Sequence, residues 1–275
     1  MKINDRIEKS RKKRLLSCVI VLLLVLSYYS GMPNNVYATT ASPDAAFTYS
    51  GVPGGGIEIT DVNTTIYGTD IVIPNQINGK TVRAISLAGE RLTSLNVSNC
   101  TSLDTLHCEY NALTTLDVSK NIILAYLNCG YNKLTALDVS KNTALRDLSC
   151  NSNNLTTLDV SKNTALIGFC CGNNKLTALD VSKHNKLQRL ECQQNQLSTL
   201  IISKINTALT YLQCENNQFI TLDVSRNTSL VYLRCNNNKL ITLDVSKNTA
   251  LTRLYCNNNR LTSLDISKNS ALTDL

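Results

Sequence analysis

Cysteine recurs in this chain at a nearly constant interval, and its thiol is the most reactive side chain that the sequence offers in a regular pattern. The step is 21 residues, with a single step of 22. The recurring cysteines are Cys108, Cys129, Cys150, Cys171, Cys192, Cys214, Cys235 and Cys256. Thiols at a regular spacing could form disulfides, bind a metal ion, or pack as small apolar side chains. The choice depends on the elements that hold the cysteines.

An asparagine follows each recurring cysteine after three residues, and the sequence around both repeats with them. The asparagines are Asn111, Asn132, Asn153, Asn174, Asn195, Asn217, Asn238 and Asn259. The shared pattern is L-x-x-L-x-C-x-x-N-x-L-x-x-L-D-V-S-x-N-x-x, and one extra residue, which we assign to Ile205, accounts for the longer step. A repeat of this length predicts a solenoid in which each copy forms one coil.

Each copy contains a short predicted strand. Leu148 and Cys150 are two residues apart, so both face the same side of a strand, and Leu155, Leu158 and Val160 turn inward from the return segment. One copy buries about six apolar side chains worth roughly 1.5–3 kcal/mol each, whereas ordering its residues costs about 1.5 kcal/mol each. A single copy therefore cannot fold, but stacked copies can. The asparagine amide lies at the bend after the strand, where it can bond backbone groups of its own coil and of the neighbouring coil.

The strand segment LRDLSCNSN at 145–153 resembles the L-x-x-L-x-L-x-x-N segment of leucine-rich repeats, with cysteine in the third leucine place. The resemblance extends over about 92–275. The cysteine and the step are similar to those of the cysteine-ladder branch of the bacterial internalin family, and residues 68–87 resemble the leader of BspA-like surface proteins. These resemblances imply an exported bacterial protein that adheres to a host or to another surface.

We therefore expect a leucine-rich repeat solenoid, which by convention belongs to the α/β horseshoe class but here is mostly β. A parallel sheet should form the concave side, and turns or short 3-10 pieces the convex side. The expected parts are a linker at 39–46, a β-rich N-terminal cap at 47–91, and the repeats at 92–275. The repeats stop within a copy, so we expect that the C-terminus is truncated.

The first 38 residues are typical of a secretory signal peptide. A basic start precedes an apolar run of 12 residues and a V-Y-A cleavage pattern ending at Ala38. An uncleaved anchor is the less favoured alternative, because a span needs about 20 apolar residues. Without this segment we expect no transmembrane helix, and a secreted or cell-surface protein of a Gram-positive bacterium. The segment also holds seven of the 27 basic residues against two of the 20 acidic ones, so the remainder is nearly neutral and a nucleic-acid partner is not expected.

The expected geometry favours packing over disulfides for the recurring cysteines. In-register parallel strands lie about 4.8 Å apart with parallel Cβ vectors, whereas a disulfide needs Cβ atoms about 3.8 Å apart and convergent. Some disulfides or a metal site remain less favoured alternatives, and the chain has only two histidines. After the predicted signal peptide, two cysteines lie outside the pattern. Cys100 takes the place of the second asparagine of its copy, as does His184, and Cys170 occupies an outward strand position.

The return segment L-D-V-S-x-N carries an aspartate and a basic residue in most copies. The aspartates are Asp117, Asp138, Asp159, Asp180, Asp223, Asp244 and Asp265, and the basic residues are Lys120, Lys141, Lys162, Lys183, Arg226, Lys247 and Lys268. Calcium binding is one possible reading, but the glycine-rich nonapeptide of calcium-binding β-rolls is absent. We favour local turns in which the aspartate bonds nearby backbone N–H groups.

Function should depend on outward strand positions that the scaffold leaves free. The two columns flanking the second leucine collect tyrosine and arginine in the later copies, and these residue types dominate interface hot spots. The candidate binding residues are Tyr126, Arg189, Glu191, Tyr211, Gln213, Tyr232, Arg234, Arg253 and Tyr255. They could instead be ordinary strand surface, because tyrosine favours strands.

Two functions fit this pattern. The first is an adhesion module that binds a protein or glycan on a host or neighbouring cell through the concave face. The second is a rigid spacer or wall component that presents another domain. No G-x-S-x-G motif or recognisable histidine site is present, so we predict neither an enzyme nor a cofactor.

Overall fold

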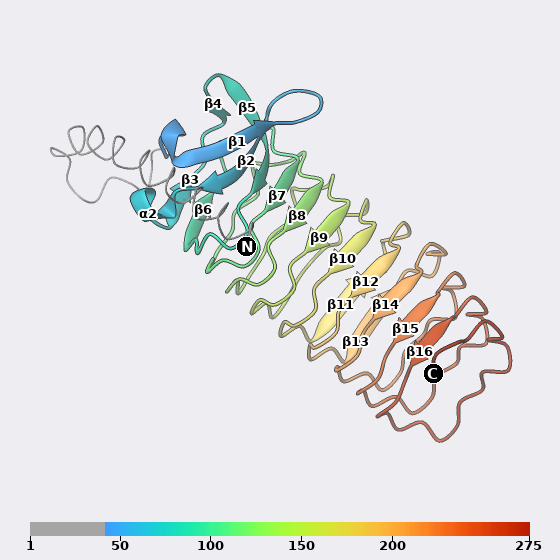
Figure 1. Cartoon of the computed structure of the whole chain (residues 1–275). Helices are drawn as coiled ribbons and strands as arrows, with labels where there is room; N and C mark the ends of the chain where they lie inside the picture. Colours follow the sequence, from blue (N-terminus) through green and yellow to red (C-terminus); the bar gives the residue numbers. More distant parts are fainter. Residues whose placement is uncertain (1–41) are drawn as a thin grey trace, which may run out of the picture. The chain divides into compact units, whose positions relative to one another are not determined.

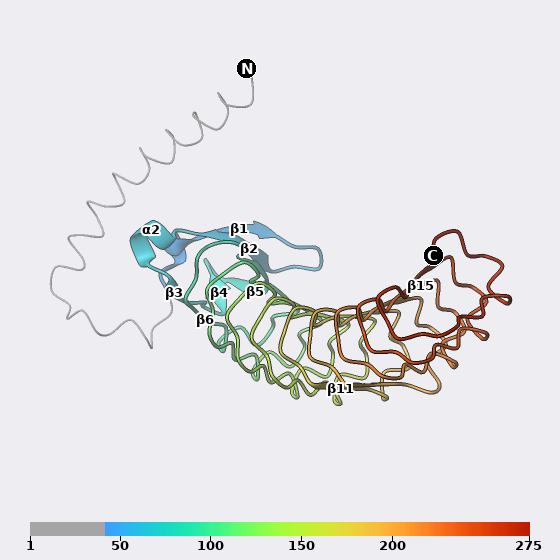
Figure 2. The same cartoon turned by 90° about the horizontal axis from the view of Figure 1, so that it is seen from below.

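The computed structural model describes residues 42–275, which form a curved solenoid (Figures 1 and 2). The signal peptide predicted at 1–38 lies outside these residues. Within the described part, no helix is both long enough and apolar enough to cross a membrane.

The N-terminal region is built from short strands that extend the sheet of the repeats. Its elements are η1 (Asp44–Ala46), β1 (Phe47–Gly51), β2 (Ile57–Val62), α2 (Thr64–Tyr67), β3 (Asp70–Val72), β4 (Gln76–Ile77), β5 (Lys80–Ser86) and β6 (Ser94–Asn96). Strand β1 pairs antiparallel with β2, β2 pairs parallel with β5, and β5 pairs parallel with the first strand of the repeats. The 3-10 helix η1 falls within the segment expected to be a linker, and its Ala46 is buried.

The repeats form a parallel, in-register sheet on the concave side. Its strands are β7 (Thr105–His107), β8 (Tyr126–Asn128), β9 (Asp147–Ser149), β10 (Gly168–Cys170), β12 (Arg189–Glu191), β14 (Tyr211–Gln213), β15 (Tyr232–Arg234) and β16 (Arg253–Tyr255). Figure 2 shows this sheet along the inner side of the curve, with the return segments outside. The central residue of each of these strands is buried, as Leu148 is in β9. The leucine-rich repeat solenoid predicted from the sequence is confirmed.

The convex side consists mostly of turns and extended chain. In the copies after β7 one strand pair interrupts it, because β11 (Ala178–Val181) and β13 (Thr199–Ile202) pair in parallel. This pair lies around the copy that carries the extra residue, and the repeat pattern did not predict it. Among residues 42–275 the 3-10 helix is found at η1 and not on the convex side.

The recurring cysteines form a ladder along the core, which we call the cysteine ladder. Its members from Cys108 to Cys235 are buried, and Cys256 in the last copy is half-buried. All ten cysteines of the described chain are free thiols. Burial raises the pKa of the Cys129 thiol to about 12, so this thiol stays protonated at neutral pH and packs as a small apolar group.

The asparagines that follow the cysteine ladder form a first asparagine ladder. Asn132 shows the arrangement that recurs in every copy. Its Nδ2 donates to the carbonyls of Cys108 in the preceding coil (3.0 Å) and of Cys129 in its own coil (3.1 Å). Its Oδ1 accepts from the backbone N–H of Leu113 at 3.0 Å. The amide therefore bonds both its own bend and the preceding coil, as the sequence predicts.

A second asparagine ladder runs through the return segments, and the sequence analysis missed it. Its members are the last asparagine of the L-D-V-S-x-N motif: Asn121, Asn142, Asn163, Asn206, Asn227, Asn248 and Asn269. All are buried. Asn163 donates to the carbonyls of Val139 and Asn142, both in the preceding coil, at 2.9 Å each. The regular recurrence of this asparagine was the available signal, because a surface turn does not need one residue type in every copy.

Candidate binding surfaces

The candidate residues of the later copies converge on the concave face. Strands β12, β14, β15 and β16 pair in register, so Tyr211 lies beside Tyr232, and Arg234 beside Tyr255. Tyr126 is not part of this group, because β8 is separated from β12 by β9 and β10. Three strand steps correspond to about 14 Å. We call the group on β12, β14, β15 and β16 the tyrosine-arginine patch.

Aromatic and cationic side chains of the patch contact one another across the strands. The rings of Tyr211 and Tyr232 stack with centroids 4.4 Å apart and planes 9° apart. The ring of Tyr255 is tilted against Tyr232 at 5.8 Å. The guanidinium of Arg189 lies 5.1 Å from the Tyr211 centroid, and that of Arg234 lies 5.6 Å from the Tyr255 centroid. These contacts hold large side chains in fixed positions, which reduces the entropy lost on binding.

The charges of the patch are largely compensated. Arg189 Nε donates to Glu191 Oε1 at 2.6 Å, and Arg253 Nε lies 3.2 Å from Asp274 Oδ2. The Tyr211 hydroxyl donates to Gln213 Oε1 at 2.9 Å. Burial raises the pKa of Tyr211 to about 12, so its hydroxyl stays protonated at neutral pH. The patch therefore presents aromatic edges and paired charges, and no excess of either sign.

Two further tyrosines, which the sequence analysis did not single out, lie just after the cysteine ladder in the first copies. Tyr110 and Tyr131 stack with centroids 4.3 Å apart and are 59% and 46% exposed. Both have positive φ, 58° and 52°. Four later copies place asparagine at this position, which is the non-glycine residue that best tolerates this backbone region. The available signal in the sequence was tyrosine at a position where the repeat usually has asparagine.

The aspartates of the convex side act in local turns. Asp117 Oδ1 accepts from the backbone N–H of Ser119 at 2.8 Å, and the same bond recurs in each copy that has the L-D-V-S motif. This backbone bond lowers the pKa of Asp117. Within residues 42–275, no group of three or more His, Cys, Asp or Glu side chains could hold a metal ion. The turn interpretation accounts for these aspartates.

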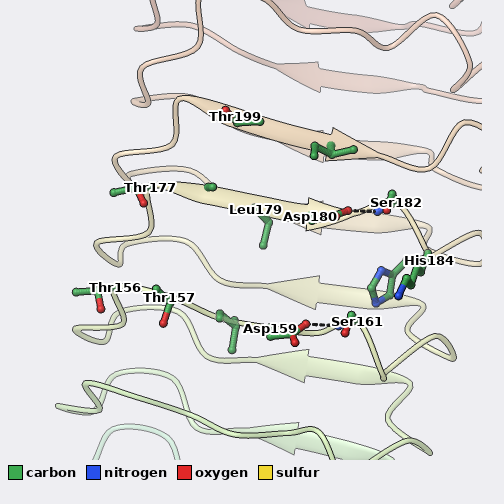
Figure 3. Close-up of a pocket in the computed structure, with 14 residues that line it drawn as sticks. Thr156, Thr157, Asp159, Ser161, Thr177, Leu179, Asp180, Ser182, His184 and Thr199 are labelled. Carbon is green, nitrogen blue, oxygen red and sulfur yellow. Dashed lines mark hydrogen bonds between the residues drawn. The ribbon is translucent and has the colours of Figure 1, made fainter.

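A groove of about 380 Å³ lies on the convex side between three return segments, at 156–161, 177–184 and 199–201 (Figure 3). Threonine, aspartate and serine side chains line most of it. It departs from the repeat chemistry at Ile201, which stands in the aspartate position, and at His184, which stands in the second asparagine ladder. His184 Nε2 lies 3.1 Å from the Val160 carbonyl, and Nδ1 is buried without a hydrogen-bond partner in the described chain. Burial lowers the pKa of His184, although Asp180 opposes the shift.

Replacing His184 with asparagine should stabilise the solenoid. The amide would keep the bond to Val160 and add one to the Asn163 carbonyl, as in the other copies, which is worth about 1 kcal/mol. Because the pKa of His184 is lowered on folding, the unfolded chain binds more protons, and the parent loses stability as the pH falls below its ordinary pKa of 6.5. Urea unfolding at pH 8 and pH 5 should show a larger gain for His184→Asn at pH 5. An equal gain at both pH values would contradict the buried neutral imidazole.

Comparisons with known proteins agree with the fold. No protein-family model and no curated protein sequence matches the chain. Among solved structures, the functional domain of InlJ from Listeria monocytogenes, which includes a cysteine ladder, is 36% identical with a TM-score of 0.67. The match covers 78% of this chain and 50% of that one, so the chain spans half the length of the Listeria protein.

Two other solved structures share the fold alone. YopM, a leucine-rich effector protein from Yersinia pestis, is 24% identical over 74% of this chain and 56% of its own, with a TM-score of 0.64. A leucine-rich repeat protein of Leptospira interrogans is 20% identical over 78% of this chain and 68% of its own, with a TM-score of 0.59. Together with the repeat and the buried cysteines, these likenesses place the chain among the leucine-rich repeat proteins, with a solenoid that resembles the cysteine-ladder internalin.

Proposed function

We propose that the chain is a secreted or cell-surface adhesion module whose tyrosine-arginine patch binds a protein or glycan on a host or neighbouring cell. Solenoids of this class offer an extended concave surface and typically act by binding rather than by catalysis. The likeness to an internalin over 78% of the chain supports a role outside the cell.

The observation that carries the proposal is the convergence of Tyr211, Tyr232 and Tyr255 with Arg189 and Arg234 on successive in-register strands. Tyrosine and arginine are the residue types that contribute most to binding energy in interfaces. Strands about 4.8 Å apart make this a patch on the order of 10–15 Å across. A standard interface takes about 800 Å² per partner, so neighbouring side chains must contribute to the contact.

The rigid spacer remains the second candidate. The two asparagine ladders favour it, because they bond successive coils to one another and stiffen the stack, although His184 interrupts the second ladder. The spacer and the adhesion module differ in what the concave face must do. A spacer needs no particular side chains there, whereas an adhesion module depends on them.

Truncating the patch should therefore abolish attachment without unfolding the chain. Each central anchor should cost about 2 kcal/mol when replaced by alanine, which is roughly a thirtyfold loss of affinity. Surface binding to host cells would be measured for a variant carrying Tyr211→Ala, Tyr232→Ala and Tyr255→Ala. The free energy of unfolding should be nearly unchanged, because these side chains project away from the core.

The matched control uses the convex side, with Lys141→Ala, Lys162→Ala and Lys247→Ala combined. This variant should bind like the parent. If both variants bind equally well and remain folded, the hypothesis of adhesion through the concave face is wrong. The rigid spacer is then the remaining candidate function.

A further inference from the structure

A row of unpaired acceptors lies beside the tyrosine-arginine patch. The residues directly after three successive members of the cysteine ladder are Gln193, Glu215 and Asn236. Gln193 Oε1, Glu215 Oε2 and Asn236 Oδ1 are all buried, and none has a hydrogen-bond partner among residues 42–275. Their strands pair in register, so the three side chains follow one another at about the strand spacing of 4.8 Å.

One unpaired donor faces this row. Arg234 Nε is also buried without a hydrogen-bond partner in the described chain. It lies 3.7 Å from Glu215 Oε1, which is too far for a hydrogen bond. The Glu215 side chain is only 8% exposed, and burial raises its pKa. Arg234 and Glu215 therefore form a loose ion pair, in which Arg234 Nε and Glu215 Oε2 lack hydrogen-bond partners.

The scaffold does not require these unpaired groups. At the same position, three of the four earlier copies have no unpaired oxygen: Gly130 and Gly172 have no side chain, and Asn151 Oδ1 accepts from the Ser149 hydroxyl at 2.8 Å. The fourth, Glu109 in the first copy, has one. Buried polar atoms are nearly always paired in native proteins, and each exception calls for an explanation. The other exceptions among the side chains of residues 42–275 are Glu109 Oε2, His184 Nδ1 and the Oδ1 atoms of five members of the second asparagine ladder, which recur with the repeat. The row instead follows β12, β14 and β15, which are strands of the patch.

A hydroxyl group satisfies this arrangement better than other common ligand groups. It can accept from Arg234 Nε–H and donate to a Glu215 oxygen at the same time. A peptide N–H or an ammonium group can only donate, and an ammonium would add charge beside Arg234. The neighbouring tyrosine rings suit the apolar C–H faces of a sugar, and the compensated charges of the patch suit a neutral ligand.

We propose that the ligand of the patch is a neutral oligosaccharide whose hydroxyls bond Gln193, Glu215, Asn236 and Arg234. The inference rests on the proposed function and names the ligand class of the same surface. The Arg234 side chain lies beside Glu215 and is 43% exposed. It can therefore shift enough to admit a hydroxyl between its Nε–H and the Glu215 carboxylate.

The test compares two equivalent glutamates. Glu215→Met removes the central acceptor of the row at similar volume. Glu109→Met is the control, because Glu109 holds the same position in the first copy, also has a buried unpaired oxygen, and lies far from the patch. Binding of the purified chain to an array of neutral hexose and N-acetylhexosamine oligosaccharides would be measured, with affinities of the hits by calorimetry.

We expect Glu215→Met to lose at least tenfold in affinity for the bound oligosaccharide, and Glu109→Met to bind like the parent. The melting temperature should change little in either variant, because each loses a buried carboxylate oxygen that has no hydrogen-bond partner. In Glu215→Met this gain is offset by the loss of the loose ion pair with Arg234. Periodate treatment of the target cells, which destroys vicinal diols, should abolish attachment, and protease treatment should not.

Two results would overturn the inference. If no oligosaccharide binds, and cell attachment depends on the tyrosines but survives periodate, the partner is a protein and only the proposed function stands. If an oligosaccharide binds equally well to the parent and to Glu215→Met, the acceptor row is not its site. If the tyrosine variant attaches to cells as well as the parent does, the proposed function itself is wrong.

Discussion

Replacing Cys150 with aspartate is expected to lower the free energy of unfolding by about 3–5 kcal/mol, because the change buries an uncompensated carboxylate. Cys150 is fully buried in the middle of the cysteine ladder. The buried aspartate should have a raised pKa, so the penalty should be greatest at neutral pH and should diminish as the pH approaches 4. Urea unfolding followed by circular dichroism at both pH values measures the effect.

The control is Asn128→Asp on the outward side of β8. Asn128 Oδ1 accepts from the Gly130 N–H at 3.2 Å, and an aspartate can keep this bond in a half-exposed position. Its effect should stay within about 1 kcal/mol. If Cys150→Asp unfolds at the same urea concentration as the parent, Cys150 does not face the core.

Replacing Asn163 with alanine should cost about 2–4 kcal/mol, although the residue carries no charge. The change removes two hydrogen bonds to backbone carbonyls, each worth about 1 kcal/mol, and leaves a small cavity. Asn163→His should be milder, because His184 shows that imidazole can keep one of these bonds. Asn154→Ala serves as the control, since neighbouring copies carry lysine at that half-buried position. Equal midpoints for Asn163→Ala and Asn154→Ala would contradict a structural role for the second asparagine ladder.

Residue alternation and register were enough to predict the sheet and the outward columns. Once Leu148 and Cys150 are assigned to one face of a strand, the repeat places every other copy and puts Tyr211 beside Tyr232. The stacking of the two rings is a finding of the structure. The second asparagine ladder was missed for a physical reason. The motif L-D-V-S-x-N has a sufficient local explanation in the aspartate–serine turn, whereas the asparagine bonds a coil about 21 residues earlier. A local explanation hides a long-range one when both repeat with the same period.

The chemistry of the patch was less accessible from the sequence. The pairing of Arg189 with Glu191 on one strand, and the loose ion pair of Arg234 and Glu215 from neighbouring copies, depend on side-chain rotamers and on burial. Neither is set by spacing alone. The strand pair β11 and β13 is a similar case, because it forms around the copy with the extra residue, where the consensus no longer applies.

The two asparagine ladders give the solenoid a direction of assembly. Asn132 reaches back to the Cys108 carbonyl, and Asn163 reaches back to Val139, so each coil bonds the coil made before it. A chain that is synthesised or exported from its N-terminus therefore meets a finished template each time a new coil emerges. Each new coil can form its asparagine bonds to the preceding coil as soon as its own residues are available. Growth of this kind keeps the exposed apolar surface close to that of a single coil throughout, which protects a long repetitive chain from pairing its copies in the wrong order.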